Sequence, residues 1–187
     1  MRRAWTGAAA VLLAGCASAG AGTPPQRTTG VVEVAAAGRQ ASRQTLEMNT
    51  YTTTVAAART LAAAPEAVWA ALDSVYASVG IPVVMRDPRN WTLGNRNFEI
   101  SRRLGGAQLS RYFTCGSTAM GTEAADSYRM QLAVWSTVRQ EGSGSRLETT
   151  ATAMARQQGT SGAPLNCAST GELEKAIANR VSVAVGG

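Results

Sequence analysis

The chain contains no histidine among its 187 residues. Histidine is the side chain whose ordinary pKa lies near neutral pH, so the most frequent proton carrier of enzyme active sites is missing. The Gly-x-Ser-x-Gly and Ser-x-x-Lys patterns of serine hydrolases are absent as well. A glycosidase would need two carboxylates facing one cleft, whereas Asp73, Glu99, Asp126 and Glu148 are scattered among polar neighbours. We therefore predict no catalytic residues and a protein that is not an enzyme; a hydrolase would require these groups to converge.

Without histidine, the sequence also lacks the ligands of a typical zinc site, because two thiolates do not complete a tetrahedral shell. The glycine-rich stretch from Gly142 to Ser145 indicates a turn, since no strand-to-helix step follows it as in a phosphate-binding loop. We predict no metal and no cofactor.

Long apolar runs are missing except at the start of the chain. Met1-Arg2-Arg3 precedes an apolar segment from Ala4 to Gly15, which is too short to span a bilayer at roughly 20 residues per crossing. A positive start, an apolar stretch of this length and small residues before a break are typical of a secretory signal. We therefore predict that residues 1–15 are a signal peptide.

Leu13-Ala14-Gly15-Cys16 ends this segment and resembles the lipobox of bacterial lipoproteins. The resemblance implies a diacylglyceryl group on the Cys16 sulfur, cleavage before Cys16, and acylation of the new amino terminus, for example with palmitate. Two or three acyl chains hold a protein firmly on a bilayer. Ala17-Ser18 resembles the pattern for transfer to the outer membrane. We therefore expect the protein to be anchored on the periplasmic face of the outer membrane. The alternative is a plain signal peptide with an incidental cysteine.

The charge of the chain is mildly positive. Removal of residues 1–15 would leave 16 basic residues against 12 acidic ones, a net charge of +4, and Lys175 is the only lysine. No block of five like charges occurs, and an exported protein rarely meets nucleic acid. We predict no nucleic-acid partner.

The segment from Cys16 to about Arg43 is rich in small and polar residues and poor in large apolar ones. Such a composition buries too little area to offset the entropy of ordering. We predict a flexible tether over 16–43, followed by a single globular domain over 44–187. Only Gly30 to Gly38 interrupts the tether, with enough β-branched residues to add an edge strand.

The globular part begins with Thr45 to Ala58, which alternates with the period of a strand. A helix is predicted from Pro65 to Gly80, because Pro65 suits its first position and Gly80 its left-handed end. The apolar positions on one face of this helix are Val68, Leu72, Val75 and Val79.

Extended segments follow, of which the clearest runs from Ser127 to Gln140 and leads through a turn into a hairpin. Its alternation predicts a core face of Tyr128, Met130, Leu132, Val134 and Val138. Ser169 and Glu172 have the spacing of a capping box before a final helix. The order of strand, helix, antiparallel strands and helix predicts an α+β domain, with an antiparallel sheet packed against two helices.

Cys115 and Cys167 are an even pair in an exported chain, which indicates a disulfide. Such a bond would clamp the entry of the final helix to a central strand. Two buried free thiols are the alternative.

Residues 62–83, with the sequence Ala-Pro-Glu-Ala-Val-Trp at their start, resemble the opening helix of helix-grip domains. Two families share this appearance. The START-like and polyketide-cyclase group encloses an apolar ligand cavity. The lipoprotein that forms the C component of the outer-membrane β-barrel assembly machinery carries such domains on a tether, and the lipobox and tether favour this second group.

Aromatic residues are few, and two of them mark a candidate contact surface. Arg86, Arg89 and Arg96 surround Trp91 in sequence, a pattern suited to lipid head groups or an acidic partner. A solvated turn with Trp91 capping the core explains the same residues. Trp135 falls on the outward face of the strongest strand, where it either anchors an interface or is covered by the tether.

Two functional hypotheses result. The first is a non-enzymatic lipoprotein that is held on an envelope membrane and binds a protein partner as an assembly or accessory factor. The second is a carrier of a small apolar molecule or lipid between the long helix and the sheet, which requires a cavity of several hundred Å³. A thin, well-packed core at the many Ala and Thr positions is the alternative to that cavity.

Overall fold

The computed structural model describes residues 27–34, 44–51, 56–159 and 163–186. The predicted signal peptide, Cys16 and most of the predicted tether lie outside these ranges. Strand β1 (Arg27–Val34) falls within the segment predicted as tether and pairs antiparallel with β2 (Gln44–Tyr51). The strand expected in Gly30 to Gly38 is therefore present as far as Val34. It belongs to a separate two-stranded sheet and does not extend the main one.

The main sheet has seven strands, and six of them follow the order β4-β5-β9-β10-β11-β8. Strand β3 (Ala56–Leu61) pairs with β10 beside β11, so these two strands share one edge of β10. The remaining strands of this sheet are β4 (Met85–Asp87), β5 (Thr92–Ser101), β8 (Phe113–Thr114), β9 (Arg129–Glu141), β10 (Gly144–Arg156) and β11 (Leu165–Ser169). Every pairing in the sheet is antiparallel.

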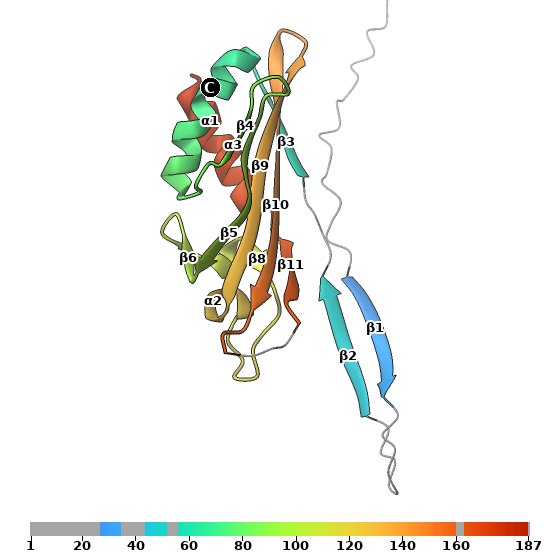
Figure 1. Cartoon of the computed structure of the whole chain (residues 1–187). Coiled ribbons are helices and arrows are strands. Elements are labelled where there is room, and N and C mark those ends of the chain that lie inside the picture. The colour runs from blue at the N-terminus through green and yellow to red at the C-terminus, as the bar shows by residue number, and fades with distance from the viewer. Residues whose placement is uncertain (1–26, 35–43, 52–55, 160–162, 187) are drawn as a thin grey trace, which may run out of the picture.

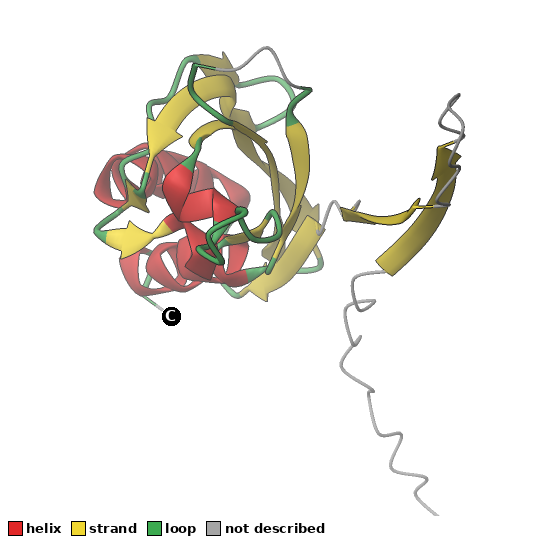
Figure 2. Cartoon of the chain, turned by 90° about the horizontal axis from the view of Figure 1, so that it is seen from below, coloured by secondary structure: helices red, strands yellow, loops and turns green. Residues whose placement is uncertain are grey.

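Helices α1 (Pro65–Val79) and α3 (Glu172–Ala184) lie on the same side of this sheet (Figure 1). Seen along the strands, the sheet curves around the two helices (Figure 2). The predicted α+β class, an antiparallel sheet packed against helices, is confirmed. A short third helix, α2 (Ala124–Ser127), precedes β9, where the sequence from Gly116 to Asp126 predicts a loop.

Helix α1 has the predicted bounds. Pro65 is its first residue, and Gly80 adopts φ 83° while its N–H donates to the Ala77 carbonyl. The predicted apolar face is buried, and Val68, Leu72 and Tyr76 are fully inaccessible to solvent. The interface between helix and sheet is thus a packed wall, as the thin-core alternative requires.

The β9–β10 hairpin also follows the prediction. Thirteen residue pairs join the strands, from Gly144↔Glu141 to Arg156↔Arg129. The buried residues of β9 alternate strictly with half-buried or exposed ones, and the inward face consists of Met130, Leu132, Val134, Ser136 and Val138.

Two expectations are wrong in part. The stretch from Thr45 to Ala58 divides into β2 and β3, separated by residues outside the described ranges. The sequence also predicts two short strands over 97–106 and 107–116. Residues 97–101 do belong to a strand, since they end β5, but the rest holds the two-residue hairpin β6 (Arg103–Leu104) with β7 (Ala107–Gln108), a 3₁₀ turn at Leu109–Arg111 and the short β8. Strand β11 has no counterpart in the sequence analysis.

The capping box before α3 is also wrong. Glu172 is the first helical residue, and Gly171 precedes it without a side-chain cap. The Ser169 hydroxyl donates instead to the Glu174 carboxylate (2.7 Å) and accepts the Gly171 N–H (3.1 Å). The sequence spaces Leu173, Ile177 and Val181 four residues apart, which predicts one apolar face of this helix, and all three are buried.

Candidate functional site

The side of the sheet opposite α1 and α3 is called the outer face below. On β9 it carries the residues that alternate with the core: Arg129, Gln131, Ala133, Trp135, Thr137 and Arg139. Trp135 is half-buried at the centre of this face, directly opposite Gly94 of β5. A Cβ atom at Gly94 would lie 2.3 Å from the Val134 carbonyl oxygen, so only glycine allows β5 to approach β9 this closely.

Arg96 covers Trp135. The pairing of β5 with β9 is irregular between Asn95 and Phe98, and this bulge changes which side chains point outward. The Arg96 guanidinium carbon lies 4.6 Å from the centroid of the Trp135 ring, within the range of a cation–π interaction. Asn95 holds the bulge, because its side-chain amide donates to the Pro82 carbonyl (2.9 Å) and its side-chain oxygen accepts the Asn97 N–H (2.9 Å).

One end of the outer face is the turn between β4 and β5. The Asp87 carboxylate accepts hydrogen bonds from the Asn90 side-chain amide (2.7 Å) and from the Arg89 N–H (3.1 Å). The bond from Asn90 is the main cause that lowers the pKa of Asp87. Trp91 follows with φ 45°, an unusual conformation for a bulky residue. It is half-buried against the core, as the capping alternative expected, and lines a pocket of about 590 Å³ with Arg89 and Arg139.

The other end lies where β9 begins and β10 ends. Arg129 and Arg156 are directly opposed across the two strands. Like charges in this position repel each other. Glu99 forms an ion pair with Arg129 at 3.2 Å, whereas no described carboxylate forms one with Arg156. Both arginines line a polar pocket of about 620 Å³ together with Gln131.

The acidic residues of the outer face are all engaged. Asp87 holds its turn, Glu99 pairs with Arg129, Glu148 pairs with Arg146 (3.0 Å), and Glu141 accepts the Thr60 hydroxyl (2.7 Å). Three arginines of this face make no ion pair with any described residue: Arg89, Arg96 and Arg156. The outer face therefore presents positive charge beside two tryptophans.

The predicted cluster of three arginines around Trp91 is not formed. Arg86 turns to the helix side of the sheet and forms an ion pair with Asp73 of α1. Arg96 lies over Trp135, and only Arg89 shares a pocket with Trp91. In the sequence, the arginines around Trp91 and the outward-facing Trp135 are separate features. The structure connects them, because Arg96 lies over Trp135. Arg96 follows two residues after Gly94, the partner of Trp135, so the contact depends on the register between β5 and β9, which the sequence does not reveal.

Cys115 and Cys167 form a disulfide, with 4.3 Å between their Cα atoms. Cys167 belongs to β11, and Cys115 directly follows β8, its neighbour in the sheet. The bond therefore joins two adjacent strands at the border of the sheet, and the expected clamp to a central strand is wrong. It still fixes β11, which leads into α3.

The core contains polar groups that the sequence did not reveal. The Tyr76 hydroxyl lies 2.8 Å from that of Ser136, which lies 2.8 Å from that of Thr149, and all three residues are buried. Glu174 of α3 is fully buried, and its Oε2 atom has no hydrogen-bond partner among the described residues. Burial is the main cause that raises the pKa of Glu174, while the bond from Ser169 opposes this shift. Burial also raises the pKa of Tyr76.

Glu174 accepts a hydrogen bond from Ser169, and its charge adds to the burial that raises the pKa of Tyr76. Within the described ranges, no group of three His, Cys, Asp or Glu residues is arranged to hold a metal ion. The scattered carboxylates of the sequence analysis stay apart as well: Asp73 pairs with Arg86, and Glu99 with Arg129.

Comparison of the chain with protein-family models, with curated proteins and with solved structures finds no match in any of the three. Among the described residues, no helix has the length and apolar character needed to cross a bilayer.

Proposed function

We propose that this protein is a lipoprotein of the bacterial cell envelope that is anchored through Cys16, is not an enzyme, and binds a protein partner as an assembly or accessory factor. The anchor rests on the signal-like start and on the lipobox-like Leu13-Ala14-Gly15-Cys16. The periplasmic face of the outer membrane is its proposed location. The proposal also includes a relationship to the helix-grip lipoproteins of the β-barrel assembly machinery. This part rests on sequence resemblance alone.

The observation that carries partner binding is the composition of the outer face. Tryptophan, methionine and arginine are enriched in the centres of protein interfaces. Trp135, Arg96 and the exposed Met154 lie together on this side, which helices α1 and α3 leave open. Packing against the helices accounts for the apolar residues on the inner side of the sheet. It does not account for a tryptophan at position 135 on the outer face.

The packing of the core favours partner binding over the carrier hypothesis. The side chains between α1 and the sheet are fully buried, including Leu72, Leu93 and Val134. An apolar groove of about 480 Å³ does lie between α1 and α3, lined by Val75 and Val183. It opens on the surface of the helix layer and not between helix and sheet, where a helix-grip carrier holds its ligand.

Two experiments test this proposal. Metabolic labelling with palmitate should mark the wild-type chain and not the Cys16→Ser variant; an unlabelled wild type would refute the anchor. A photo-crosslinking amino acid at Thr150, on the outer face, should then give one reproducible protein adduct in membranes. The same residue at Lys175, on the exposed side of α3, is the matched control. Absence of an adduct from Thr150, or equal adducts from both positions, would refute binding through the outer face.

A further inference from the structure

We infer that the outer face binds an extended, acidic peptide segment of the partner protein. The binding surface, called the arginine–tryptophan stripe, consists of Arg89, Trp91, Arg96, Arg129, Trp135 and Arg156. This inference rests on the proposed function, because it specifies the chemistry of the partner that the function requires.

The first argument is the linear arrangement of the stripe. Arg129 and Arg139 are ten residues apart on β9, a distance of about 34 Å at the rise of an antiparallel strand. Pockets lie near both ends of this length, and the Arg96–Trp135 pair lies between them. An extended peptide of about ten residues has the same length, so its alternate side chains would meet successive parts of the stripe.

The second argument is that the positive charge of the stripe is only partly compensated. Arg89, Arg96 and Arg156 form no ion pair with a described residue, although the Arg89 charge does act on Asp87, and the carboxylates Asp87, Glu99, Glu141 and Glu148 are already engaged. Arg156 also faces Arg129 directly, and since Glu99 pairs with Arg129, a carboxylate of the ligand would find Arg156 as the uncompensated charge of the two. Acidic side chains are the complementary ligands, since guanidinium groups bind carboxylates through two parallel hydrogen bonds.

The third argument is the fixed position of Arg96. Stacking on Trp135 restricts its guanidinium plane, and neither a hydrogen bond nor an ion pair to a described residue uses its N–H donors. A guanidinium held in this way loses little side-chain entropy when it binds a carboxylate. The centre of the stripe is therefore prepared for an anionic group.

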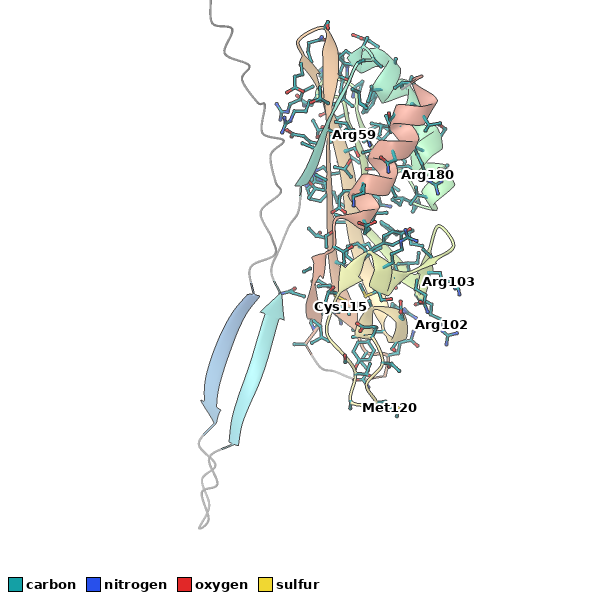
Figure 3. All side chains as sticks on the ribbon, turned by 180° about the vertical axis from the view of Figure 1, so that it is seen from behind. Arg59, Arg102, Arg103, Cys115, Met120 and Arg180 are labelled. Carbon is teal, nitrogen blue, oxygen red and sulfur yellow. A yellow bond between two sulfur atoms is a disulfide. The ribbon has the colours of Figure 1, made fainter. Side chains whose placement is uncertain are left out.

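Other occupants fit less well. The predicted tether of this chain is itself basic, with Arg27, Arg39 and Arg43 against Glu33, so it is not complementary to the stripe. A second copy would oppose the same positive charges. A lipid surface would favour projecting apolar side chains. The most exposed ones, Met120 and Val183, lie in a loop and on α3, outside the stripe (Figure 3).

The test measures binding of fluorescein-labelled decaglutamate to the full chain carrying Cys16→Ser, which has no acyl chains. Binding should weaken with added salt, and decalysine should not bind. The variant Arg89→Gln/Arg96→Gln/Arg156→Gln should bind decaglutamate about tenfold more weakly. Its melting temperature serves as the check that the fold is retained.

The control is Arg102→Gln/Arg103→Gln, which removes two exposed arginines away from the outer face that form no ion pair with a described residue (Figure 3). It should change the affinity less than about twofold. Equal weakening by both variants, or no binding by the parent chain, would overturn the inference. Arginine-dependent binding to phosphatidylglycerol vesicles, without binding to decaglutamate, would overturn it in favour of a lipid surface.

The inference and the proposed function fail in different ways. If the Thr150 crosslink forms in membranes with the same yield in the triple variant, partner binding stands and the acidic segment is wrong. If decaglutamate binding depends on the stripe but no partner is crosslinked, the proposed function is wrong. The inference that the stripe binds acidic peptides would still stand.

Discussion

Alternate residues of β9 serve two surfaces that differ in almost every physical property. The inner residues, such as Leu132 and Val134, are buried beneath α1 and α3. The outer residues, such as Trp135 and Arg139, remain half-buried or exposed among charged neighbours. Because successive side chains of a strand point to opposite faces, one segment of sequence encodes both a core and a candidate interface. The difference fits the proposal that one face stabilises the fold while the other binds a partner.

The largest expected effect concerns the border between these surfaces. The variant Cys115→Ser/Cys167→Ser removes the bond that fixes β11 beside β8. The bond closes a loop of 52 residues, so its loss should lower the free energy of unfolding by about 4 kcal/mol. Chemical denaturation of the oxidised wild type and the variant measures this. Unchanged stability would show that the disulfide is dispensable for the sheet.

The next effect separates the two faces directly. Leu132→Ala leaves a cavity under the helices and should cost about 3 kcal/mol. Thr150→Ala, on the outer face of β10, should cost about 0.5 kcal/mol, because it removes half-buried surface without a cavity. Urea denaturation of both variants checks the contrast. Similar losses would mean that the outer face is as important for stability as the core.

A smaller, pH-dependent effect concerns the buried carboxyl group of the inner side. Because burial raises the pKa of Glu174 in the folded state, the folded protein is stabilised below the ordinary pKa and loses that contribution as the pH rises through the raised value. Glu174→Gln should abolish this loss and be the more stable form at high pH. The difference should reach about 1.4 kcal/mol for each unit by which the pKa is raised.

Glu172→Gln is the control for this experiment. The hydrogen bond from Lys175 lowers the pKa of Glu172, which is the opposite direction, so its contribution to stability is present at high pH and lost on acidification. Denaturation midpoints measured across the pH range should therefore change with opposite sign in the two variants. Parallel pH profiles of wild type and Glu174→Gln would show that Glu174 does not titrate as described.

The smallest effect on stability is expected in the stripe. Arg96→Gln removes the cation–π contact with Trp135 and should cost about 0.5–1 kcal/mol, while it should clearly weaken decaglutamate binding. Thermal unfolding and fluorescence anisotropy on the same samples measure the two quantities. A large loss of stability without a loss of binding would assign Arg96 to the fold and not to recognition.

Elements with a strong periodic pattern could be predicted from the sequence. The apolar face of α1 and the alternation of β9 are long enough for periodicity to fix both type and orientation. Strand β11 could not be predicted, because five residues with the sequence Leu-Asn-Cys-Ala-Ser show no alternation and owe their conformation to β10 and β8.

The candidate site could be predicted only in part. Trp135 was assigned to the outward face correctly, because its position follows from the period of β9. Its contact with Arg96 depends on the pairing of Gly94 with Trp135, a register between β5 and β9 that is set by the tertiary structure and cannot be read from the sequence of either strand. The burial of Glu174 was missed for a related reason: its partner Ser169 belongs to β11, and a charged residue in the first turn of a helix ordinarily faces solvent.

Hydroxyl-radical footprinting of the lipidated protein in its native membranes and after purification tests the central claim most directly, because tryptophan and methionine are both oxidised by the radical. The account predicts that Trp135 and Met154 are protected in the membranes, whereas Met120, which is 93% exposed in a loop away from the stripe, is oxidised equally in both samples. Equal oxidation of Trp135 and Met154 in the two samples would contradict it.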